Sequence, residues 1–308
     1  MPMTDDNTAN DRPRTVGEAL QYCATQLEAS DVFFGHGTDN AWDEAVQLVL
    51  GVADLPLDSG EGVMPHPLDD AGFASLEAML RRRIENHEPL PYILGRAWFA
   101  GLEFLCDPRA IIPRSPIAEL ILHGFKPWYS GPQPQRLLDM CCGGGCIGLA
   151  AAHFWPQLIV DLVDLDENAL ALAADNVKFL GLQQRCSIVQ SNLFDQLKPQ
   201  SYDLIVSNPP YVSQDDLAAM PAEYHHEPSL ALASGPDGLT LTRQILQRAA
   251  DFLSPDGLLV VEVGNSWQDL EKHYPQLPFT WLEFEHGGHG VLAITAKELQ
   301  EYSTSFTG

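Results

Sequence analysis

The chain has 308 residues, enough to bury a full core and to form one large domain with a smaller one. Apolar residues make up 45%, which indicates a globular protein, and no stretch reaches the ~18 consecutive apolar residues of a membrane span. Lysine and arginine together number 17 against 42 aspartates and glutamates, a formal net charge of -25. This charge repels phosphate backbones and attracts basic partners, so we expect no direct binding of nucleic acid.

The start of the chain, MPMTDDNTANDRPR, has neither an apolar core nor a basic beginning, so it does not read as a signal peptide. We expect a frayed tail there, no membrane attachment and a cytoplasmic protein. Six cysteines are scattered or crowded without a paired framework. Reduced, buried thiols explain this pattern better than disulfides or a metal site.

From Thr15 to about Glu88, apolar residues recur three and four positions apart, which predicts helices separated by Pro and Gly clusters. We therefore predict a helical N-terminal domain over residues 1–93. The stretch that begins at Pro89 turns extended, and we interpret residues 94–131 as a hairpin linker, with a helix starting near Ser115.

From Arg136 onward, strand-like apolar runs alternate with helical patterns. This alternation predicts an α/β fold over residues 132–308, with a mainly parallel sheet that helices cover on both faces. The last two extended runs, FTWLEFE and GVLAIT, are joined by a glycine pair with no helix between them. They predict an antiparallel hairpin that closes the sheet.

The segment LLDMCCGGGCIGLA places a strand, an acid, a glycine-rich turn and a helix in that order. Gly143, Gly145 and Gly148 satisfy G-x-G-x-x-G, so a dinucleotide site has to be considered. Asp139, at the strand end, is suited to accept a hydrogen bond from an amino group. The order D-x-x-x-G-x-G resembles the cofactor turn of S-adenosylmethionine-dependent methyltransferases, with Cys141 in place of the usual first glycine.

Three more residues are candidates for cofactor binding. Asp164 ends the next strand, where such folds place the acid that holds both ribose hydroxyls. A dinucleotide fold would place an acid there too, so Asp164 does not discriminate. Asn192 and Leu193 follow the third strand, where the edge and face of an adenine would lie, and an aspartate is common at the position of Asn192.

The tetrad Asn208, Pro209, Pro210 and Tyr211 follows the strand-like run YDLIVS. Two prolines end the strand and fix an extended bend, so the Pro209 carbonyl and the Asn208 side-chain oxygen can point at one amino group. Tyr211 can then stack on the planar group that carries the nitrogen. Such a site methylates a planar amino nitrogen by orienting it toward an electrophilic methyl group, and no general base stands out.

The segment EYHHE, Glu223 to Glu227, invites a metal interpretation. Its two histidines are adjacent rather than four apart on a helix, so their side chains would diverge. We expect a loop packed beside the active site and no metal.

Several stretches together resemble one enzyme family, the protein-(glutamine) N5-methyltransferases related to the peptide release factor enzyme. The resemblance runs from about Arg81 to Leu299 and rests on PLPYILGRAWFAGLEF, IPRSPIAELI, LDMCCGGGCIGLA, SNPPYVSQDDLAAMPAEYHHEPSLALASGPDGL, VEVGNS and EFEHGGHGVL. The release-factor branch carries Pro-Glu-Thr-Glu-like residues after Pro-Arg, whereas this chain has Ser-Pro-Ile-Ala-Glu from Ser115. This difference favours the branch that methylates the third protein of the large ribosomal subunit.

The resemblance implies a seven-stranded class I (Rossmann-like) methyltransferase domain, S-adenosylmethionine as cofactor, an N5-methylglutamine product and a helical N-terminal domain that recognises the protein substrate. A basic ribosomal protein would be drawn to so acidic an enzyme. The alternatives are methylation of release factors, adenine amino methylation of nucleic acid, a non-catalytic binding protein for ribosomal proteins, and a nicotinamide dehydrogenase, which would leave the tetrad unexplained.

Overall fold

The protein is described by a computed structural model that covers residues 12–198 and 200–303. Contacts divide it into two units, Met1–Gly95 with Pro221–His226 and Arg96–Met220 with Glu227–Gly308. The domain boundaries drawn from the sequence stay predictions. The frayed tail was expected mainly at residues 1–11, which lie outside the described residues.

The first unit is built on helices that begin at clear capping residues. The side chains of Thr15, Asn40 and Asp69 accept backbone N–H bonds at the starts of α1 (Val16–Glu28), α2 (Ala41–Val52) and α3 (Asp70–Glu85). Their apolar faces form one buried cluster. The helices thus have the amphipathic spacing that the sequence predicted.

The extended structure predicted from Pro89 is wrong at its start. Residues Leu90–Leu94 form a short helix, α4, with proline in its first turn and Gly95 in the left-handed conformation at its end. Five residues are too few to show a helical period, so the proline and glycine were the only available signals.

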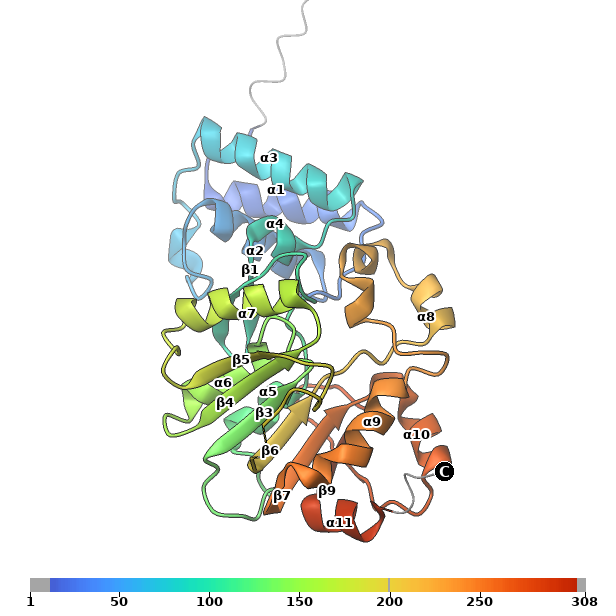
Figure 1. The fold of residues 1–308 in the computed structure, drawn as a ribbon. Coiled ribbons are helices and arrows are strands. Elements are labelled where there is room, and N and C mark those ends of the chain that lie inside the picture. The colour runs from blue at the N-terminus through green and yellow to red at the C-terminus, as the bar shows by residue number, and fades with distance from the viewer. Residues whose placement is uncertain (1–11, 199, 304–308) are drawn as a thin grey trace, which may run out of the picture. The chain divides into compact units, whose positions relative to one another are not determined.

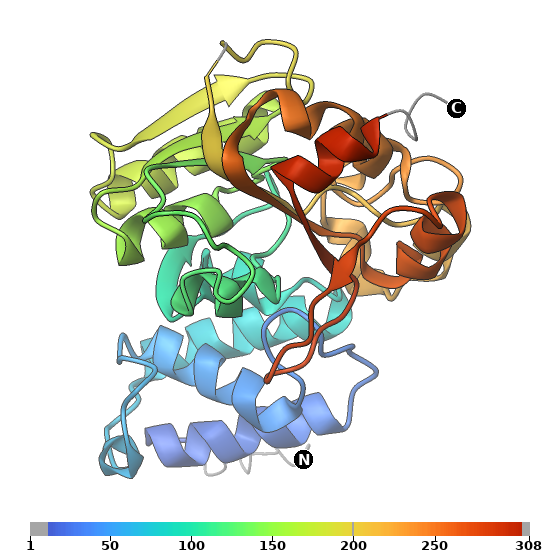
Figure 2. The same ribbon diagram turned by 90° about the horizontal axis from the view of Figure 1, so that it is seen from below.

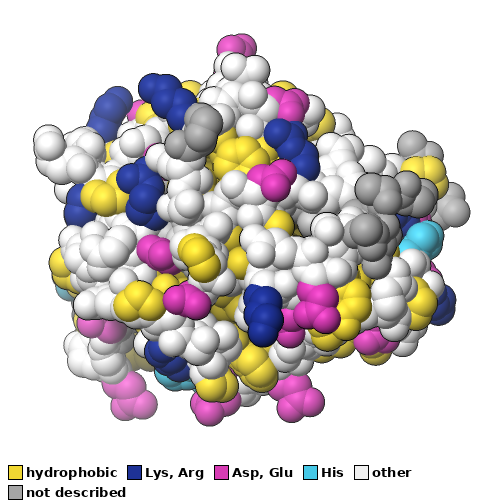
Figure 3. All heavy atoms as spheres, turned by 60° about the horizontal axis from the view of Figure 1, so that its bottom comes forward, with side chains coloured by type: hydrophobic (Ala, Val, Ile, Leu, Met, Phe, Trp, Pro, Cys, Tyr) yellow, Lys and Arg dark blue, Asp and Glu magenta, His cyan; other side chains and the backbone are white. Residues whose placement is uncertain are grey.

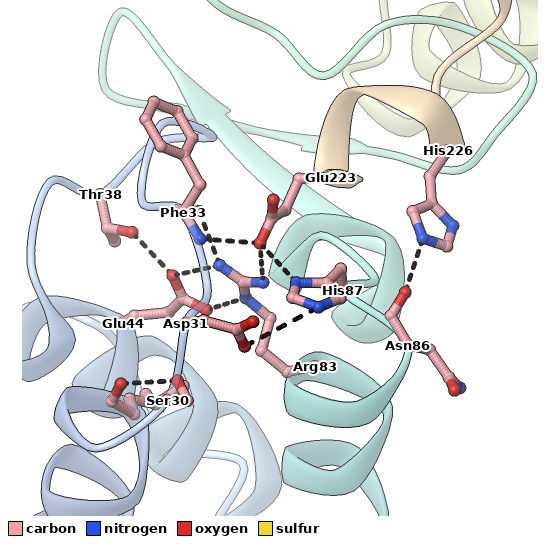
Figure 4. Close-up of polar contacts among 11 residues, drawn as sticks. Ser30, Asp31, Phe33, Thr38, Glu44, Arg83, Asn86, His87, Glu223 and His226 are labelled. Atoms are coloured by element: carbon pink, nitrogen blue, oxygen red, sulfur yellow. Dashed lines mark hydrogen bonds and ion pairs between the residues drawn. The ribbon is translucent and has the colours of Figure 1, made fainter. Parts of the chain in front are cut away.

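The first unit has a buried ionic cluster around Arg83, on α3 (Figure 4). The guanidinium contacts Glu44, pairs with Glu223 at 2.9 Å and donates to the Phe33 carbonyl at 2.8 Å. Glu223 comes from the short helix η2 (Ala222–His226), which belongs to this unit although it is distant in sequence. Burial alone would raise the pKa of Glu223, but hydrogen bonds from Arg83 and Phe33 lower it.

The second unit begins with an antiparallel hairpin, β1 (Arg96–Phe99) and β2 (Leu102–Leu105), followed by α5 (Ile117–Leu122). The Ser115 hydroxyl accepts the Ile117 N–H at 3.1 Å, but the N-cap of this helix is Pro116, one residue later than Ser115.

The rest of the second unit is a seven-stranded sheet in the order β5-β4-β3-β6-β7-β9-β8. Its strands are β3 (Arg136–Met140), β4 (Ile159–Asp164), β5 (Cys186–Gln190), β6 (Tyr202–Ser207), β7 (Leu253–Glu262), β8 (Thr280–Trp281) and β9 (Val291–Thr295). β9 runs antiparallel to β7 and β8, and the other pairs are parallel. The predicted α/β fold and closing hairpin are confirmed. If the strands of this sheet are renumbered along the chain, with β3 as the first, their order across the sheet is 3-2-1-4-5-7-6.

Helices cover both faces of this sheet (Figures 1 and 2). One face packs against α5, α6 (Cys146–Phe154) and α7 (Glu167–Phe179). The other packs against α9 (Thr240–Arg248), α10 (Trp267–His273) and α11 (Ala296–Glu301). Because neighbouring strand residues point to opposite faces, Leu137 joins the first core and Leu138 the second.

One face of the surface carries Lys and Arg side chains among Asp and Glu side chains (Figure 3). The excess of negative charge is therefore not gathered into a single patch on that face. Among the described residues, no helix is both long and apolar enough to cross a membrane.

Candidate active site

A cavity opens at the carboxyl ends of β3, β4, β5 and β6, where open parallel sheets bind ligands. The sequence predicted seven of its lining residues: Cys141, Gly143, Asp164, Asn192, Leu193, Asn208 and Pro210. Four other predicted residues do not line it: Asp139, Gly145, Pro209 and Tyr211. The structure thus brings Cys141 and Gly143 of the glycine-rich turn and Asn208 and Pro210 of the tetrad to one cavity.

Residues Cys141 to Gly145 form a tight turn between β3 and α6. Cys141, Gly143 and Gly145 all have positive φ, at 58°, 54° and 83°. A left-handed backbone explains why glycine is usual at the first of these positions, where this chain has cysteine. A side chain at Gly143 would meet only the Ala110 methyl, at 3.8 Å, so what glycine contributes there is its left-handed backbone.

Asp164, the last residue of β4, supports this turn. One of its oxygens accepts the Gly143 N–H at 2.9 Å, and the other accepts the Asp166 N–H at 3.0 Å. Each oxygen keeps a second lone pair for a ligand hydroxyl. Burial raises the pKa of Asp164, and these backbone bonds oppose the rise. Beside it, Ile111, Leu193 and Leu230 give the cavity apolar walls. A carboxylate that can still accept hydrogen bonds, next to apolar walls, fits the ribose hydroxyls and the adenine of S-adenosylmethionine in chemical character.

We expect Asp164→Ala to weaken S-adenosylmethionine binding roughly 10²–10⁴-fold, because the two hydrogen bonds that the carboxylate would accept from the ribose hydroxyls are lost and each contributes ~1.5–3 kcal/mol. Isothermal titration calorimetry measures the dissociation constant. The matched control is Glu167→Ala, which removes an exposed carboxylate from the first turn of α7. Equal affinities of the Asp164 variant and the wild type would contradict this role.

Asp139 lies in a different environment from the one predicted. It is 1% exposed, and one carboxylate oxygen accepts the Gly148 N–H of α6 at 2.7 Å. The other oxygen is buried with no hydrogen-bond partner among the described residues. Burial raises the pKa of Asp139 to about 7, although the bond from Gly148 opposes the rise. A contact with the cofactor's amino group stays a prediction.

Asp139 should make stability depend on pH. With a pKa of about 7 in the folded state and ~3.9 unfolded, the folded state binds more protons between these values. The free energy of unfolding therefore falls as pH rises from about 4 to 7. An asparagine at this position cannot titrate, so we expect Asp139→Asn to exceed the wild type in Tm by several degrees at pH 8, and by less at pH 5. Calorimetric scans measure both, and parallel Tm curves for the two proteins would contradict this ionisation.

Asn192 and Leu193 follow β5 and border the cavity. Leu193 is buried and has a positive φ of 49°, so its side chain is held at the wall by an unusual backbone. Asn192 is exposed, and its amide donates to Asp195 at 3.3 Å. Asn192 is thus positioned by a local turn, and its contact with adenine stays a prediction.

Asn208 comes directly after β6 and is partly buried. Its Nδ2 donates to the Arg114 carbonyl at 3.3 Å. This bond orients the amide and leaves Oδ1 to accept from a ligand. Arg114 is itself held by Glu227, whose side chain is fully buried and makes a second contact with the guanidinium at 2.6 Å.

Tyr211 lies in a second cavity, which Arg114, Ser115 and Glu262 also line. Its hydroxyl donates to Glu262 at 3.1 Å. Asn208 and Pro210 therefore border the first cavity, and Tyr211 borders the second. The predicted stacking of Tyr211 on the substrate's planar group stays a prediction.

Sequence reasoning missed part of the first cavity. Arg109, Ala110 and Ile111 come from the loop before α5, and Pro228, Leu230 and Ala231 come from the segment after the tetrad. The available signal was the family resemblance of the segment around EPSLALASG. No spacing rule marks these residues, since they reach the cavity through loops.

The crowded cysteines are not reactive groups of this site. Burial raises the pKa of Cys141, Cys142 and Cys146, so they stay protonated thiols. Within residues 12–198 and 200–303, no group of three or more His, Cys, Asp or Glu side chains is arranged to hold a metal ion. His225 and His226, which suggested a metal, lie on η2 in the first unit.

The strand order 3-2-1-4-5-7-6, the glycine turn after the first sheet strand and the cavity beyond it define the class I methyltransferase fold. A family model described as a methyltransferase small domain matches residues 119–224. The solved hMettl16 catalytic domain, in complex with MAT2A 3′UTR hairpin 1, shares the fold with a TM-score of 0.52 and 15% identity, over 96% of each chain.

Two curated proteins are much more similar in sequence. The ribosomal protein uL3 glutamine methyltransferase of Francisella tularensis subsp. tularensis is 44% identical over 95% of this chain and 93% of its own length. The protein of that name from Xanthomonas campestris pv. campestris is 44% identical over 97% of each. This chain belongs to the family of ribosomal protein uL3 glutamine methyltransferases. It is a methyltransferase, and its methyl donor is S-adenosylmethionine.

Proposed function

We propose that this protein transfers a methyl group from S-adenosylmethionine to the side-chain amide nitrogen of a glutamine in ribosomal protein uL3. The observation that carries the reaction type is the Asn208 amide, which its bond to the Arg114 carbonyl orients at the edge of the cofactor cavity. The names of the two relatives that are 44% identical support the substrate.

Asn208 and Pro209 would orient the target nitrogen. With Nδ2 bound to Arg114, the Asn208 oxygen is free to accept one amide hydrogen, and the Pro209 carbonyl would accept the other. Two acceptors hold the NH2 group flat with its nitrogen toward the cavity. S-adenosylmethionine, when bound, supplies a methyl group already activated on a sulfonium, so positioning can provide most of the rate enhancement.

Asp164, Gly143 and Leu193 would hold the cofactor. The Asp164 carboxylate is suited to the ribose hydroxyls, and the left-handed backbone at Gly143 lets the turn follow the ligand. The apolar Leu193 side chain would cover one face of the adenine. Cys141, Gly145, Asn192 and Asn208 complete the proposed cofactor set, with Asp139 beneath the turn.

We assign recognition of the protein substrate to the helical N-terminal domain, because the family resemblance implies it. A free, basic ribosomal protein is a suitable partner for a chain with a formal net charge of -25, and direct nucleic acid binding is not expected. The six free thiols fit a reducing compartment, and we place the reaction in the cytoplasm.

The test is transfer of tritium from labelled S-adenosylmethionine to purified uL3 and, in parallel, to release factor and to RNA. We expect label on a uL3 glutamine, located by peptide mass spectrometry. Label on release factor alone would assign the protein to the sister activity, and label on RNA alone would make it an adenine methyltransferase. Cofactor binding with no label on any substrate would indicate a non-catalytic binding protein.

A further inference from the structure

The segment VEVGNS, Val261 to Ser266, has no role in the site described so far, yet it surrounds Tyr211. Glu262 ends β7, the strand next to β6, and its carboxylate accepts the Tyr211 hydroxyl at 3.1 Å. The Ser266 hydroxyl donates to the Tyr211 carbonyl at 3.2 Å. The segment thus holds both the backbone and the side chain of this tyrosine.

Gly264 makes room for the ring. A Cβ atom added there would lie 2.6 Å from Cε2 of Tyr211, and the φ of Gly264 is +49°. Gly238 does the same for the backbone, since its Cβ would lie 2.0 Å from the Tyr211 carbonyl oxygen. The ring therefore fits against a surface that only glycines leave open.

The carboxylate of Glu262 has a second donor. Ser115 Oγ donates to its other oxygen at 2.6 Å, so each oxygen receives one hydroxyl. Glu262 is 6% exposed, and burial raises its pKa against the effect of these two bonds and of the nearby Arg114 charge. A buried carboxylate costs stability that an apolar residue would not. Its presence beside Tyr211 is better explained by a role in positioning.

We infer that Glu262 is a positioning residue that fixes the Tyr211 ring through its hydroxyl, and that Ser115 holds Glu262 in place. Ser115 is the first residue after Pro-Arg, where the release-factor branch has a different sequence. The loop that distinguishes the two branches therefore contacts Glu262, which in turn contacts Tyr211 of the tetrad. The effect on catalysis rests on the proposed function. The contact itself does not, because it can be observed without substrate.

The kinetic test compares Tyr211→Phe, Glu262→Gln, Ser115→Ala and Ser115→Thr in tritium transfer to uL3. We expect the first two to lower kcat roughly tenfold to a hundredfold, as loss of a hydrogen bond to a charged group predicts, with the dissociation constant of S-adenosylmethionine within about threefold of wild type. Ser115→Ala should lower kcat about threefold to tenfold, and Ser115→Thr, which keeps the hydroxyl, should restore it. The double variant Tyr211→Phe/Glu262→Gln should be no slower than the slower single variant, because both remove one interaction.

Tyr202→Phe is the matched control. Tyr202 begins β6, at the opposite end of the strand from the tetrad, and its hydroxyl donates to the buried Asp161 carboxylate at 2.8 Å. Loss of the Tyr202 hydroxyl should lower Tm and leave kcat within about twofold of the wild-type value. Wild-type kcat in Glu262→Gln, or losses that multiply in the double variant, would overturn a role for Glu262 in positioning.

A second measurement needs no substrate. The protein's eight tyrosines can be labelled with 3-fluorotyrosine, and the Tyr211 resonance assigned by its loss in Tyr211→Phe. We expect Glu262→Gln to shift or broaden this ¹⁹F resonance and to leave the Tyr202 resonance in place. An unchanged Tyr211 resonance would refute the contact by which Glu262 fixes the Tyr211 ring. A shifted resonance in an enzyme that does not label uL3 would refute the proposed function and leave this contact supported.

Discussion

Asn208→Ala should lower the rate of glutamine methylation roughly 10²–10³-fold and leave S-adenosylmethionine binding nearly unchanged. The variant loses the side-chain oxygen that would hold the target NH2 group. Removal of one preoriented polar group at a reacting centre typically has an effect of this size. The Arg114 carbonyl also loses its donor, at a residue that is only partly buried.

The measurement is single-turnover tritium transfer to uL3 at saturating cofactor, with the dissociation constant of S-adenosylmethionine determined on the same preparation. Asp164→Ala is the complementary variant, since it should weaken cofactor binding and recover much of its rate when the cofactor is saturating. A loss below tenfold in Asn208→Ala, or a loss explained by weaker cofactor binding, would remove Asn208 from the catalytic group.

Arg83→Met should lower the free energy of unfolding by about 3–5 kcal/mol, the usual effect of removing one partner from a buried ion pair. The Arg83 side chain is 2% exposed, and its loss leaves Glu44 and Glu223 buried without their cation (Figure 4). The Phe33 carbonyl also loses its donor. Methionine keeps much of the arginine volume, so the loss reports on charge and hydrogen bonding rather than on a cavity.

Urea unfolding monitored by circular dichroism measures this loss, and the two units make it necessary to fit each transition separately. Arg81→Met on the same helix is the control. Arg81 pairs with Glu85 across exposed side chains, 67% and 66% accessible, and such pairs contribute ~0–1 kcal/mol. Equal losses from the two variants would mean that the buried cluster adds no more than the surface pair.

By itself the sequence determined most of the helices and strands, because the spacing of apolar residues that predicts them is a local pattern. Amphipathic spacing predicted the helices of the N-terminal unit, and the alternation after Arg136 predicted a parallel sheet with helices on both faces. The tetrad at Asn208 and the glycine turn at Gly143 were found because both follow strand ends, and the carboxyl ends of parallel strands share one edge. Family motifs added the reaction and the cofactor.

Only the tertiary structure decided which of these residues share a cavity. Asp139 precedes the turn in sequence, yet its carboxylate is buried against the Gly148 N–H, because successive residues of β3 point to opposite faces of the sheet and Asp139 points toward α6. Tyr211 belongs to the tetrad but borders the second cavity, held by Glu262 from a strand about 50 residues later. Arg83 is buried and pairs with Glu223, which is 140 residues away in the sequence. Contacts of this kind depend on long-range packing, which local sequence patterns do not encode.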